Sequence, residues 1–380
     1  MKAASVSDFR ELARRRLPNI FFEYIDGGSY AEETLRRNVA DLEAIALRQL
    51  VMRDTTKLDM TVETLGQTLK MPVGLSPVGM AGMYARRGEA QAARAAARAG
   101  VPFCLSTVGV CSIEEVARTG APPWFQLYML KDRGYMRELL QRAKAAGCPV
   151  LVFTVDLPTP GSRYRDIRSG FAGATPLQAA LTQAWDGVTH PGWTWDVFVH
   201  GRPHTLGTVA GAVTEGRRVT DFLSWIARNF DRSVTWKDMD WVRETWDGPI
   251  VVKGVLDAAD ARDAVKAGAQ GLVVSNHGGR QLDGVKSSIS ALPRIAQAVG
   301  GDLELYMDGG VRSGLDVLKA LALGAKACFV GRPWAWALGA GGEPAVAKML
   351  DILRAELAVA MILTGCTDVR QAGRSLLDEG

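Results

Sequence analysis

Eight short runs of apolar and β-branched residues recur along the chain, and a segment long enough to hold a helix follows each one. They have the length and composition of buried strands and span residues 72–76, 101–107, 124–128, 150–156, 250–255, 271–276, 303–308 and 327–331. Between them, stretches rich in Ala, Arg, Glu and Leu have helical spacing, and a glycine that suits a C-cap follows most of them: 88–99, 135–146, 258–267 and 314–323. This alternation predicts an α/β fold, a (β/α)8 TIM barrel.

The size of the chain agrees with one barrel and its additions. With 380 residues, 47% of them hydrophobic, the chain can bury a large core. We expect a single domain over residues 1–380, with the barrel at about 70–350. An N-terminal helical segment precedes it, and a long insertion at about 168–248 separates the fourth and fifth strands.

Composition excludes several classes of function. The net charge of +4 is spread without a long basic block, so no nucleic-acid partner is expected. The five cysteines lack CxxC spacing and a nearby histidine, which favours buried thiols and no metal site. No GxGxxG or GxxxxGK motif is present, which argues against NAD and ATP chemistry. No stretch reaches the roughly 18 apolar residues of a membrane span, and residues 1–18 lack a signal-peptide core. These features favour the cytoplasm.

The segment Ser275-Asn276-His277-Gly278-Gly279-Arg280 places a titratable base beside a fixed cation. It follows the sixth predicted strand, so it lies on the catalytic face of a barrel. An imidazole can take a hydroxyl proton near neutral pH, and a guanidinium can hold a carboxylate by two hydrogen bonds. Together they suit a 2-hydroxy acid. Taken alone, the hexapeptide better fits a histidine hydrogen-bonded in a turn and an arginine on the surface.

The loops after the last two strands predict a phosphate site. Asp308-Gly309-Gly310-Val311-Arg312 follows the seventh strand and Gly331-Arg332 the eighth, where many such barrels bind phosphate with backbone N–H groups. Glycine turns with surface arginines are the structural alternative, and a phosphate site alone would also fit a sugar-phosphate isomerase.

Other strand ends favour a flavin. Ser106, Gln126 and Thr154 are uncharged groups that suit an isoalloxazine edge. Lys253 ends the fifth strand, where its charge would stabilise the anionic reduced ring.

These motifs resemble the FMN-dependent 2-hydroxy acid dehydrogenase and oxidase family over nearly the whole chain. The resemblance rests on SPVGMAGMYARRGE, LSTVGVCSIEEVA, WFQLYMLKDRG, LVFTVDLPTPGSRYRD, VVKGVLDAADA, SNHGGRQLDG and MDGGVRSGLDVLKALALGA. Within the family, the chain is most similar to the bacterial branch that oxidises L-lactate and passes electrons to quinone or cytochrome, not to NAD.

The resemblance implies a role for each matching residue. His277 would be the catalytic base, and Asp156 would hold its ring. Arg163 and Arg280 would bind the substrate carboxylate, and Tyr24 and Tyr128 would hydrogen-bond the carboxylate and the reacting hydroxyl. The implied FMN contacts are Pro77, Val78 and Gly79 at the flavin face; Ser106, Gln126, Thr154, Lys253 and Ser275 around ring and ribityl chain; and Asp308, Gly309, Gly310, Val311, Arg312, Gly331 and Arg332 at ribityl and phosphate. Both tyrosines also fit core aromatics, and Asp156 a turn cap.

The implied reaction is oxidation of L-lactate to pyruvate. His277 would remove the hydroxyl proton while the C2 hydrogen passes to the flavin as hydride; a carbanion route uses the same residues. The family also implies a homotetramer. An oxidase that uses oxygen, and a dehydrogenase for glycolate or mandelate, stay open, although oxidases of the family often carry alanine where this chain has Gly79. A flavin-binding scaffold without turnover is disfavoured because His277, Arg163 and Arg280 are all present.

The insertion is unusually rich in aromatic residues. Seven of the ten tryptophans lie within it: Trp185, Trp193, Trp195, Trp225, Trp236, Trp241 and Trp246. Tryptophan next to Arg and Lys is typical of surfaces that rest in a headgroup layer. We expect Trp185, Trp193 and Trp195 to touch the membrane, whereas the last three suit packing onto the barrel. With the resemblance, this predicts peripheral attachment to the cytoplasmic side of the inner (plasma) membrane.

Overall fold

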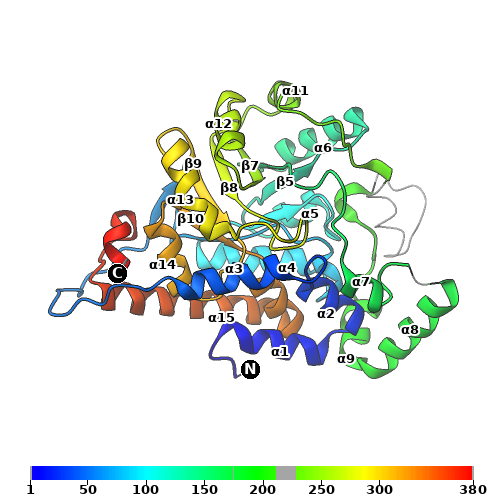
Figure 1. The fold of residues 1–380 in the computed structure, drawn as a ribbon. Coiled ribbons are helices and arrows are strands. Elements are labelled where there is room, and N and C mark those ends of the chain that lie inside the picture. The colour runs from blue at the N-terminus through cyan, green and yellow to red at the C-terminus, as the bar shows by residue number, and fades with distance from the viewer. Residues whose placement is uncertain (1, 174, 211–227, 379–380) are drawn as a thin grey trace.

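The computed structural model describes residues 2–173, 175–210 and 228–378, and these form the predicted (β/α)8 barrel (Figure 1). Its strands are β3 (Val73–Leu75), β4 (Cys104–Ser106), β5 (Trp124–Tyr128), β6 (Leu151–Thr154), β7 (Ile250–Val255), β8 (Gly271–Val274), β9 (Glu304–Asp308) and β10 (Ala327–Val330). They pair in parallel in the order β3-β10-β9-β8-β7-β6-β5-β4. A parallel bridge between Leu75 and Phe103 brings β3 beside β4 and closes the ring.

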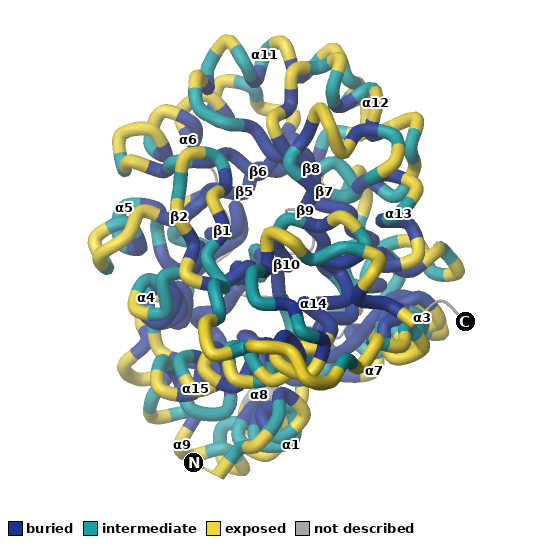
Figure 2. The backbone as a smooth tube through the Cα atoms, turned by 90° about the vertical axis from the view of Figure 1, so that its left-hand side faces the viewer, coloured by how far each residue is buried: buried dark blue, intermediate teal, exposed yellow. Residues whose placement is uncertain are grey.

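Helices cover the outside of the strand ring, and Figure 2 shows buried strands inside partly exposed helices. The helices are α4 (Gly88–Ala99), α5 (Ile113–Ala117), α6 (Arg133–Ala145), α11 (Asp238–Thr245), α12 (Ala258–Lys266), α13 (Ser288–Val299), α14 (Gly314–Ala322) and α15 (Arg332–Thr364). Gly100 ends α4 in the left-handed conformation expected of a C-cap, at φ 69°.

One end of the barrel is filled by side chains. Trp124 packs against Tyr306 and Phe329 inside the ring, with ring centroids 5.9 and 5.3 Å away. Across this end lies the hairpin of β1 (Val62–Thr64) and β2 (Gln67–Leu69), where Gln67 Oε1 accepts a hydrogen bond from Trp124 Nε1 at 3.2 Å. A ligand can therefore enter only at the C-terminal ends of the strands.

The predicted N-terminal helical segment comprises α1 (Val6–Arg16), α2 (Asn19–Asp26) and α3 (Glu33–Ala44). Helix α1 packs along α15 (Figure 1). Helix α2 ends at the open end of the barrel, where Ser29 N donates to Gly279 O at 2.8 Å. This segment thereby becomes part of the wall of the site.

The insertion between β6 and β7 begins with α7 (Tyr164–Arg168), α8 (Pro176–Thr189), α9 (Pro191–Trp193) and the π-helical turn η2 (Thr194–Val199). Trp185 and Trp195 are 70% and 66% exposed. The expectation for Trp193 was wrong: it is buried, packs at a tilt against Phe21 and donates its indole N–H to Met83 O at 2.8 Å. Trp246 is buried, Trp236 and Trp241 pack against the core, and Trp225 lies outside the described residues.

Candidate functional site

The open end of the barrel holds a pocket with about 1080 Å³ of empty space, part of which is open to solvent. The predicted residues that line it are Tyr24, Pro77, Val78, Gly79, Tyr128, Arg163, Lys253, His277, Arg280, Asp308, Gly309, Gly310, Val311, Arg312, Gly331 and Arg332. The predicted residues outside this lining are Ser106, Gln126, Thr154, Asp156 and Ser275. Of these five, Asp156 hydrogen-bonds to His277 and Ser275 to Lys253, and both partners line the pocket. The other three are buried.

His277 and Asp156 form a hydrogen-bonded pair, with His277 Nδ1 at 2.8 Å from Asp156 Oδ1. Asp156 follows β6, and a register irregularity in β7 makes room for it. Gly254 lies at this irregularity with φ 108°, and a Cβ there would come within 2.5 Å of the Asp156 side chain. Because Nδ1 is engaged by Asp156, Nε2 is the ring nitrogen available to a ligand.

The electrostatics keep this pair ready to accept a proton. Burial lowers the pKa of the His277 imidazole below its ordinary value, although the charge of Asp156 acts in the opposite direction. Burial alone would raise the pKa of Asp156, but the His277 charge and hydrogen bond outweigh it and hold that pKa below its usual range. At neutral pH the ring is therefore neutral beside a carboxylate, as a general base requires.

The loop that carries His277 is held in an uncommon conformation. His277, Gly278 and Gly279 have φ values of 57°, 65° and 72°. Such backbone at a non-glycine residue persists only where neighbours fix it. Here Asn276 exchanges two side-chain hydrogen bonds, of 2.9 and 2.8 Å, with Asn38 of α3. Its Oδ1 also accepts a hydrogen bond from Gly279 N at 3.0 Å.

Two guanidinium groups meet at the Tyr24 ring. The Cζ atoms of Arg280 and Arg163 lie 4.8 and 5.9 Å from the ring centroid. Burial lowers the pKa of Arg163, and the neighbouring charge of Arg280 adds to the shift. A carboxylate between these cations would offset their repulsion and accept paired hydrogen bonds.

Tyr128 lies beside this cation pair. Burial raises the pKa of its phenol, so the hydroxyl stays protonated and can donate a hydrogen bond.

Strand register aligns the predicted flavin-edge residues. Thr154 pairs with Tyr128 on one side and with Lys253 on the other. Ser106 Oγ donates to Gln126 Oε1 at 3.2 Å. The Gln126 Nε2 and Thr154 Oγ1 atoms are buried and have no protein partner in the described structure. An unpaired buried donor is costly, so these atoms suit a ligand that supplies the missing acceptors.

Lys253 is fixed at the same edge. Its ammonium lies 3.1 Å from Asp308 Oδ2 and donates to Ser275 Oγ at 3.1 Å. Burial lowers its pKa, but the charge of Asp308 outweighs this and raises the pKa above the ordinary value. The lysine therefore carries a permanent positive charge under the pocket.

The loops after β9 and β10 lie where the sequence predicts a phosphate site. Gly309 and Gly310 both have φ of 93°, and α15 begins directly after Gly331, so backbone N–H groups and a helix N-terminus converge there. Burial lowers the pKa of Arg312 to about 10. Burial, with the charges of Arg280 and Arg312, lowers the pKa of Arg332 well below its ordinary value. A bound anion would offset this crowding of cations.

Arg332 is oriented in a way that the sequence did not indicate. Its guanidinium donates to the carbonyl oxygens of Gly27, Gly278 and Asp26 at 2.7, 2.7 and 3.2 Å. Three of its five N–H groups are thus committed to backbone, which leaves two for a ligand.

Sequence reasoning missed several lining residues. Ser76 follows β3 directly before Pro77, and its buried Oγ has no protein partner in the described structure. Leu157 and Pro160 lie in the loop just after Asp156. The rule that barrel sites gather at the C-terminal ends of strands would have identified these three. Val108 and Phe329 also line the pocket, but nothing in the sequence around them indicated a place in the site.

Comparison with known proteins agrees with this geometry. Residues 13–379 match the family described as FMN-dependent dehydrogenase. The chain belongs to this family. It is 57% identical over 378 residues to an L-lactate dehydrogenase of Caulobacter sp. (strain K31), with 99% of each chain covered.

Solved structures give the same result. The monotopic membrane protein (S)-mandelate dehydrogenase is 32% identical, with all of both chains covered and a TM-score of 0.93. A mandelate oxidase with (S)-4-hydroxymandelic acid is 39% identical, with 99% of this chain and 98% of that one covered and a TM-score of 0.85. The protein is therefore an FMN-dependent 2-hydroxy acid dehydrogenase or oxidase.

The residues present fit FMN on structural grounds. Unpaired buried Gln126 Nε2 and Thr154 Oγ1 suit the polar edge of a ring. The backbone of Gly309 and Gly310, with Arg312 beside it, suits a phosphate.

We predict that Asp156→Asn lowers the maximal rate of reduction of bound FMN by a 2-hydroxy acid by about 10² to 10⁴. His277 is active only when neutral, so activity is lost as pH falls through its pKa. Because Asp156 raises that pKa, its removal should move the acid limb of the pH profile to lower pH. Rapid-mixing measurements across pH test this. A limb that moves to higher pH, or an unchanged rate, would contradict the assignment.

Proposed function

We propose that the protein oxidises L-lactate to pyruvate with FMN and passes the electrons to a quinone or cytochrome of a respiratory chain. The observation that carries this proposal is the His277–Asp156 pair in one pocket with the two guanidinium groups at Tyr24. The identity of 57% to a protein named L-lactate dehydrogenase supports the substrate.

Binding of the substrate begins with its carboxylate. Arg163 and Arg280 would hold it, since a desolvated carboxylate needs cationic partners. The Nη1 of Arg280 donates to Tyr24 O and Gly27 O at 2.6 and 2.8 Å, so Nε and Nη2 remain for the substrate. Tyr24 would hydrogen-bond the carboxylate and Tyr128 the reacting hydroxyl.

Proton removal would then fall to His277. The hydroxyl proton passes to Nε2, and Asp156 stabilises the imidazolium at Nδ1. FMN, when bound, supplies a ring that accepts the two electrons from C2. Lys253 would place a positive charge near that ring, and its ion pair with Asp308 keeps it in position.

The remaining cofactor contacts follow from the pocket. Pro77, Val78 and Gly79 would meet the flavin face, and Ser106, Gln126, Thr154 and Ser275 its edge and the ribityl chain. Asp308 would meet the ribityl chain, and Arg312 and Arg332, with the backbone from Gly309 to Val311 and at Gly331, would hold the phosphate.

Gly79 bears on the choice between dehydrogenase and oxidase. A Cβ at this position would lie 2.7 Å from Val108 Cγ2 and 3.5 Å from the Tyr24 hydroxyl. Alanine, which oxidases of the family often carry there, would displace Val108 in this chain. The packing therefore explains why this chain keeps glycine here, and glycine is the residue that the family resemblance associates with dehydrogenases.

Steady-state assays test the proposal. We expect turnover of L-lactate to exceed that of glycolate and mandelate, and a quinone analogue to be a better acceptor than oxygen. Turnover of mandelate faster than that of L-lactate would make mandelate the substrate, as the names of the solved relatives suggest. Efficient turnover with oxygen alone would make the protein an oxidase.

Membrane attachment is a separate part of the proposal. Six exposed apolar side chains form what we call the apolar ridge: Leu181, Trp185, Val188, Trp195, Phe198 and Val199. The first three, at i, i+4 and i+7, share one face of α8. In Figure 1, α8 and α9 lie at the edge of the molecule beside α1. No helix in the described part of the chain is long and apolar enough to cross a membrane.

We infer peripheral binding through this ridge, on the cytoplasmic side of the inner membrane, where a quinone can collect the electrons. The solved relative described as a monotopic membrane protein supports attachment. We also propose a homotetramer, for which the exposed Val359, Ile362 and Leu363 of α15 offer a contact surface.

We predict that the double variant Trp185→Ser and Trp195→Ser lowers binding to lipid vesicles about tenfold or more, because both indoles lose apolar contact with the bilayer. Reduction of FMN by L-lactate should be unchanged. The matched control is Met52→Ser, at an apolar residue that is 97% exposed outside the insertion. Vesicle co-sedimentation provides the measurement. Unchanged vesicle binding of the double variant would disprove membrane attachment through the apolar ridge. Loss of flavin would show that the two indoles stabilise the fold.

A further inference from the structure

The C-terminal end of α2 touches both arginine sites of the pocket through its backbone. The carbonyl oxygens of Tyr24 and Gly27 accept hydrogen bonds from Arg280 Nη1. The Gly27 carbonyl also accepts one from Arg332 Nη2, and the Asp26 carbonyl accepts one from Arg332 Nε. Three carbonyl groups of the last turn of α2 and its C-cap thus orient one arginine at the substrate carboxylate and another at the cofactor phosphate.

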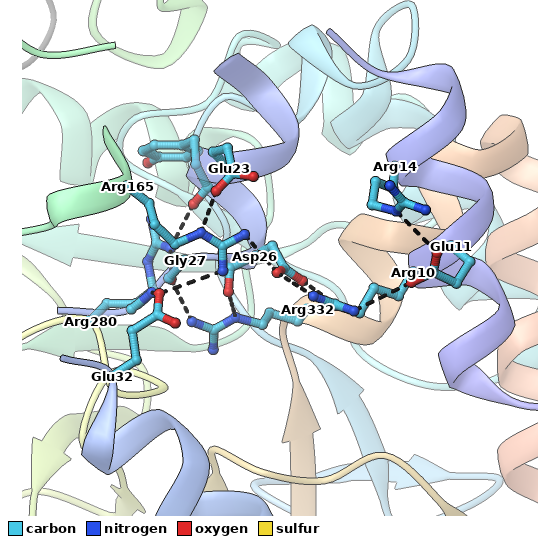
Figure 3. Close-up of polar contacts among 12 residues, drawn as sticks. Arg10, Glu11, Arg14, Glu23, Asp26, Gly27, Glu32, Arg165, Arg280 and Arg332 are labelled. Carbon is cyan, nitrogen blue, oxygen red and sulfur yellow. Dashed lines mark hydrogen bonds and ion pairs between the residues drawn. The ribbon is translucent and has the colours of Figure 1, made fainter. Parts of the chain in front are cut away.

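The position of this backbone is fixed from outside the pocket by the side chain of Asp26, which is 3% exposed. Arg10 of α1 donates to both of its oxygens, at 2.6 and 2.8 Å. Arg165 of α7 donates to Oδ2 at 2.9 Å. Figure 3 shows Asp26 between the guanidinium groups of Arg10 and Arg165. The guanidinium of Arg332 lies below Asp26 in this view. Paired hydrogen bonds to a charged group are among the most directional contacts in proteins.

Arg165 extends the arrangement to both sides of the loop. Its Nε donates to Glu23 one turn earlier in α2, and its Nη1 lies 3.5 Å from Glu32 Oε1. Glu32 Oε1 in turn accepts a hydrogen bond from Gly28 N at 2.8 Å. The carboxylates of Glu23, Asp26 and Glu32 therefore clamp the segment 23–32 onto α7. None of the three lines the pocket.

Charge balance gives Asp26 a second effect. Arg280, Arg332 and Arg312 crowd together, and the Asp26 carboxylate is among the negative charges that act on Arg332. Removing it would free the α2 carbonyls to move and would also increase the repulsion between the arginines.

We propose that Asp26, held by Arg10 and Arg165, is a positioning residue that sets the affinity for both the substrate carboxylate and the FMN phosphate by fixing the carbonyl groups that orient Arg280 and Arg332. The inference rests on the proposed function. Asp26 touches neither ligand, and its effect passes through backbone. Its loss therefore weakens two binding steps at once, while the His277–Asp156 pair is left intact.

The test compares Asp26→Asn and Arg165→Gln with Glu11→Gln. Glu11 pairs with Arg10 and Arg14 on the exposed face of α1, so it controls for changes of charge nearby. We expect both test variants to raise the KM for L-lactate and the Kd of the FMN-free protein for FMN about tenfold or more. The kcat should fall by no more than about threefold, with an unchanged acid limb, because the proton acceptor is untouched. Glu11→Gln should leave all four quantities unchanged.

Flavin fluorescence titration gives the Kd without any turnover, and steady-state kinetics of the loaded enzyme give KM and kcat. A merely structural role would lower the melting temperature without separating KM from kcat. Folded variants whose KM and Kd stay within about twofold of the parent would overturn the proposal. If the parent protein itself is not reduced by L-lactate, the proposed function fails, and the FMN titration still tests Asp26.

Discussion

The site depends on cations that are held, largely removed from water, at the open end of the barrel. Arg163, Arg280, Arg312, Arg332 and Lys253 line one pocket, and Asp308 is the carboxylate that shares this lining. Burying a charge is unfavourable, and burial is the largest cause of the lowered pKa values of Arg163, Arg312 and Arg332. The pocket is therefore complementary to two anions. In the proposed function, one is the substrate carboxylate at Tyr24 and the other is the FMN phosphate at the α15 N-terminus.

Strand register and backbone hydrogen bonds hold these charges in place, although several of them lie on loops. Register places Thr154 between Tyr128 and Lys253, and the irregularity at Gly254 admits Asp156. Backbone carbonyls fix the arginines, as at Gly27, which accepts from two of them. Such preorganisation limits the rearrangement that binding requires.

Much of the fold and of the candidate site could be predicted from the sequence, because local patterns of residues determine them. The eight strands appeared where apolar runs predicted them, and the glycine pair after β9 lies beside Gly331 after β10 in one pocket. The pattern also brought the predicted lining residues together, since parallel strands end at one face. The pairing of His277 with Asp156 was implied by family resemblance. Their separation of 121 residues means that no local signal defines it.

Contacts between distant segments could not be predicted. Asn38 and Asn276 are 238 residues apart, and Arg332 and Gly27 are 305 apart. Trp193 lies two residues from the exposed Trp195, yet it turns inward to Met83. Composition treats both indoles alike, and only tertiary packing separates them.

The oxidation of L-lactate with His277 as the base is tested most directly by a single-turnover comparison of the parent protein with His277→Gln. Both are purified with FMN and mixed with L-lactate in the absence of oxygen, while the flavin absorbance is followed. We expect both to bind FMN equally. The parent flavin should bleach rapidly, and that of the variant about 10² to 10⁴ times more slowly or not at all. Comparable bleaching of the variant would contradict the role of His277 as the base. No bleaching of the parent by L-lactate would contradict the proposed reaction.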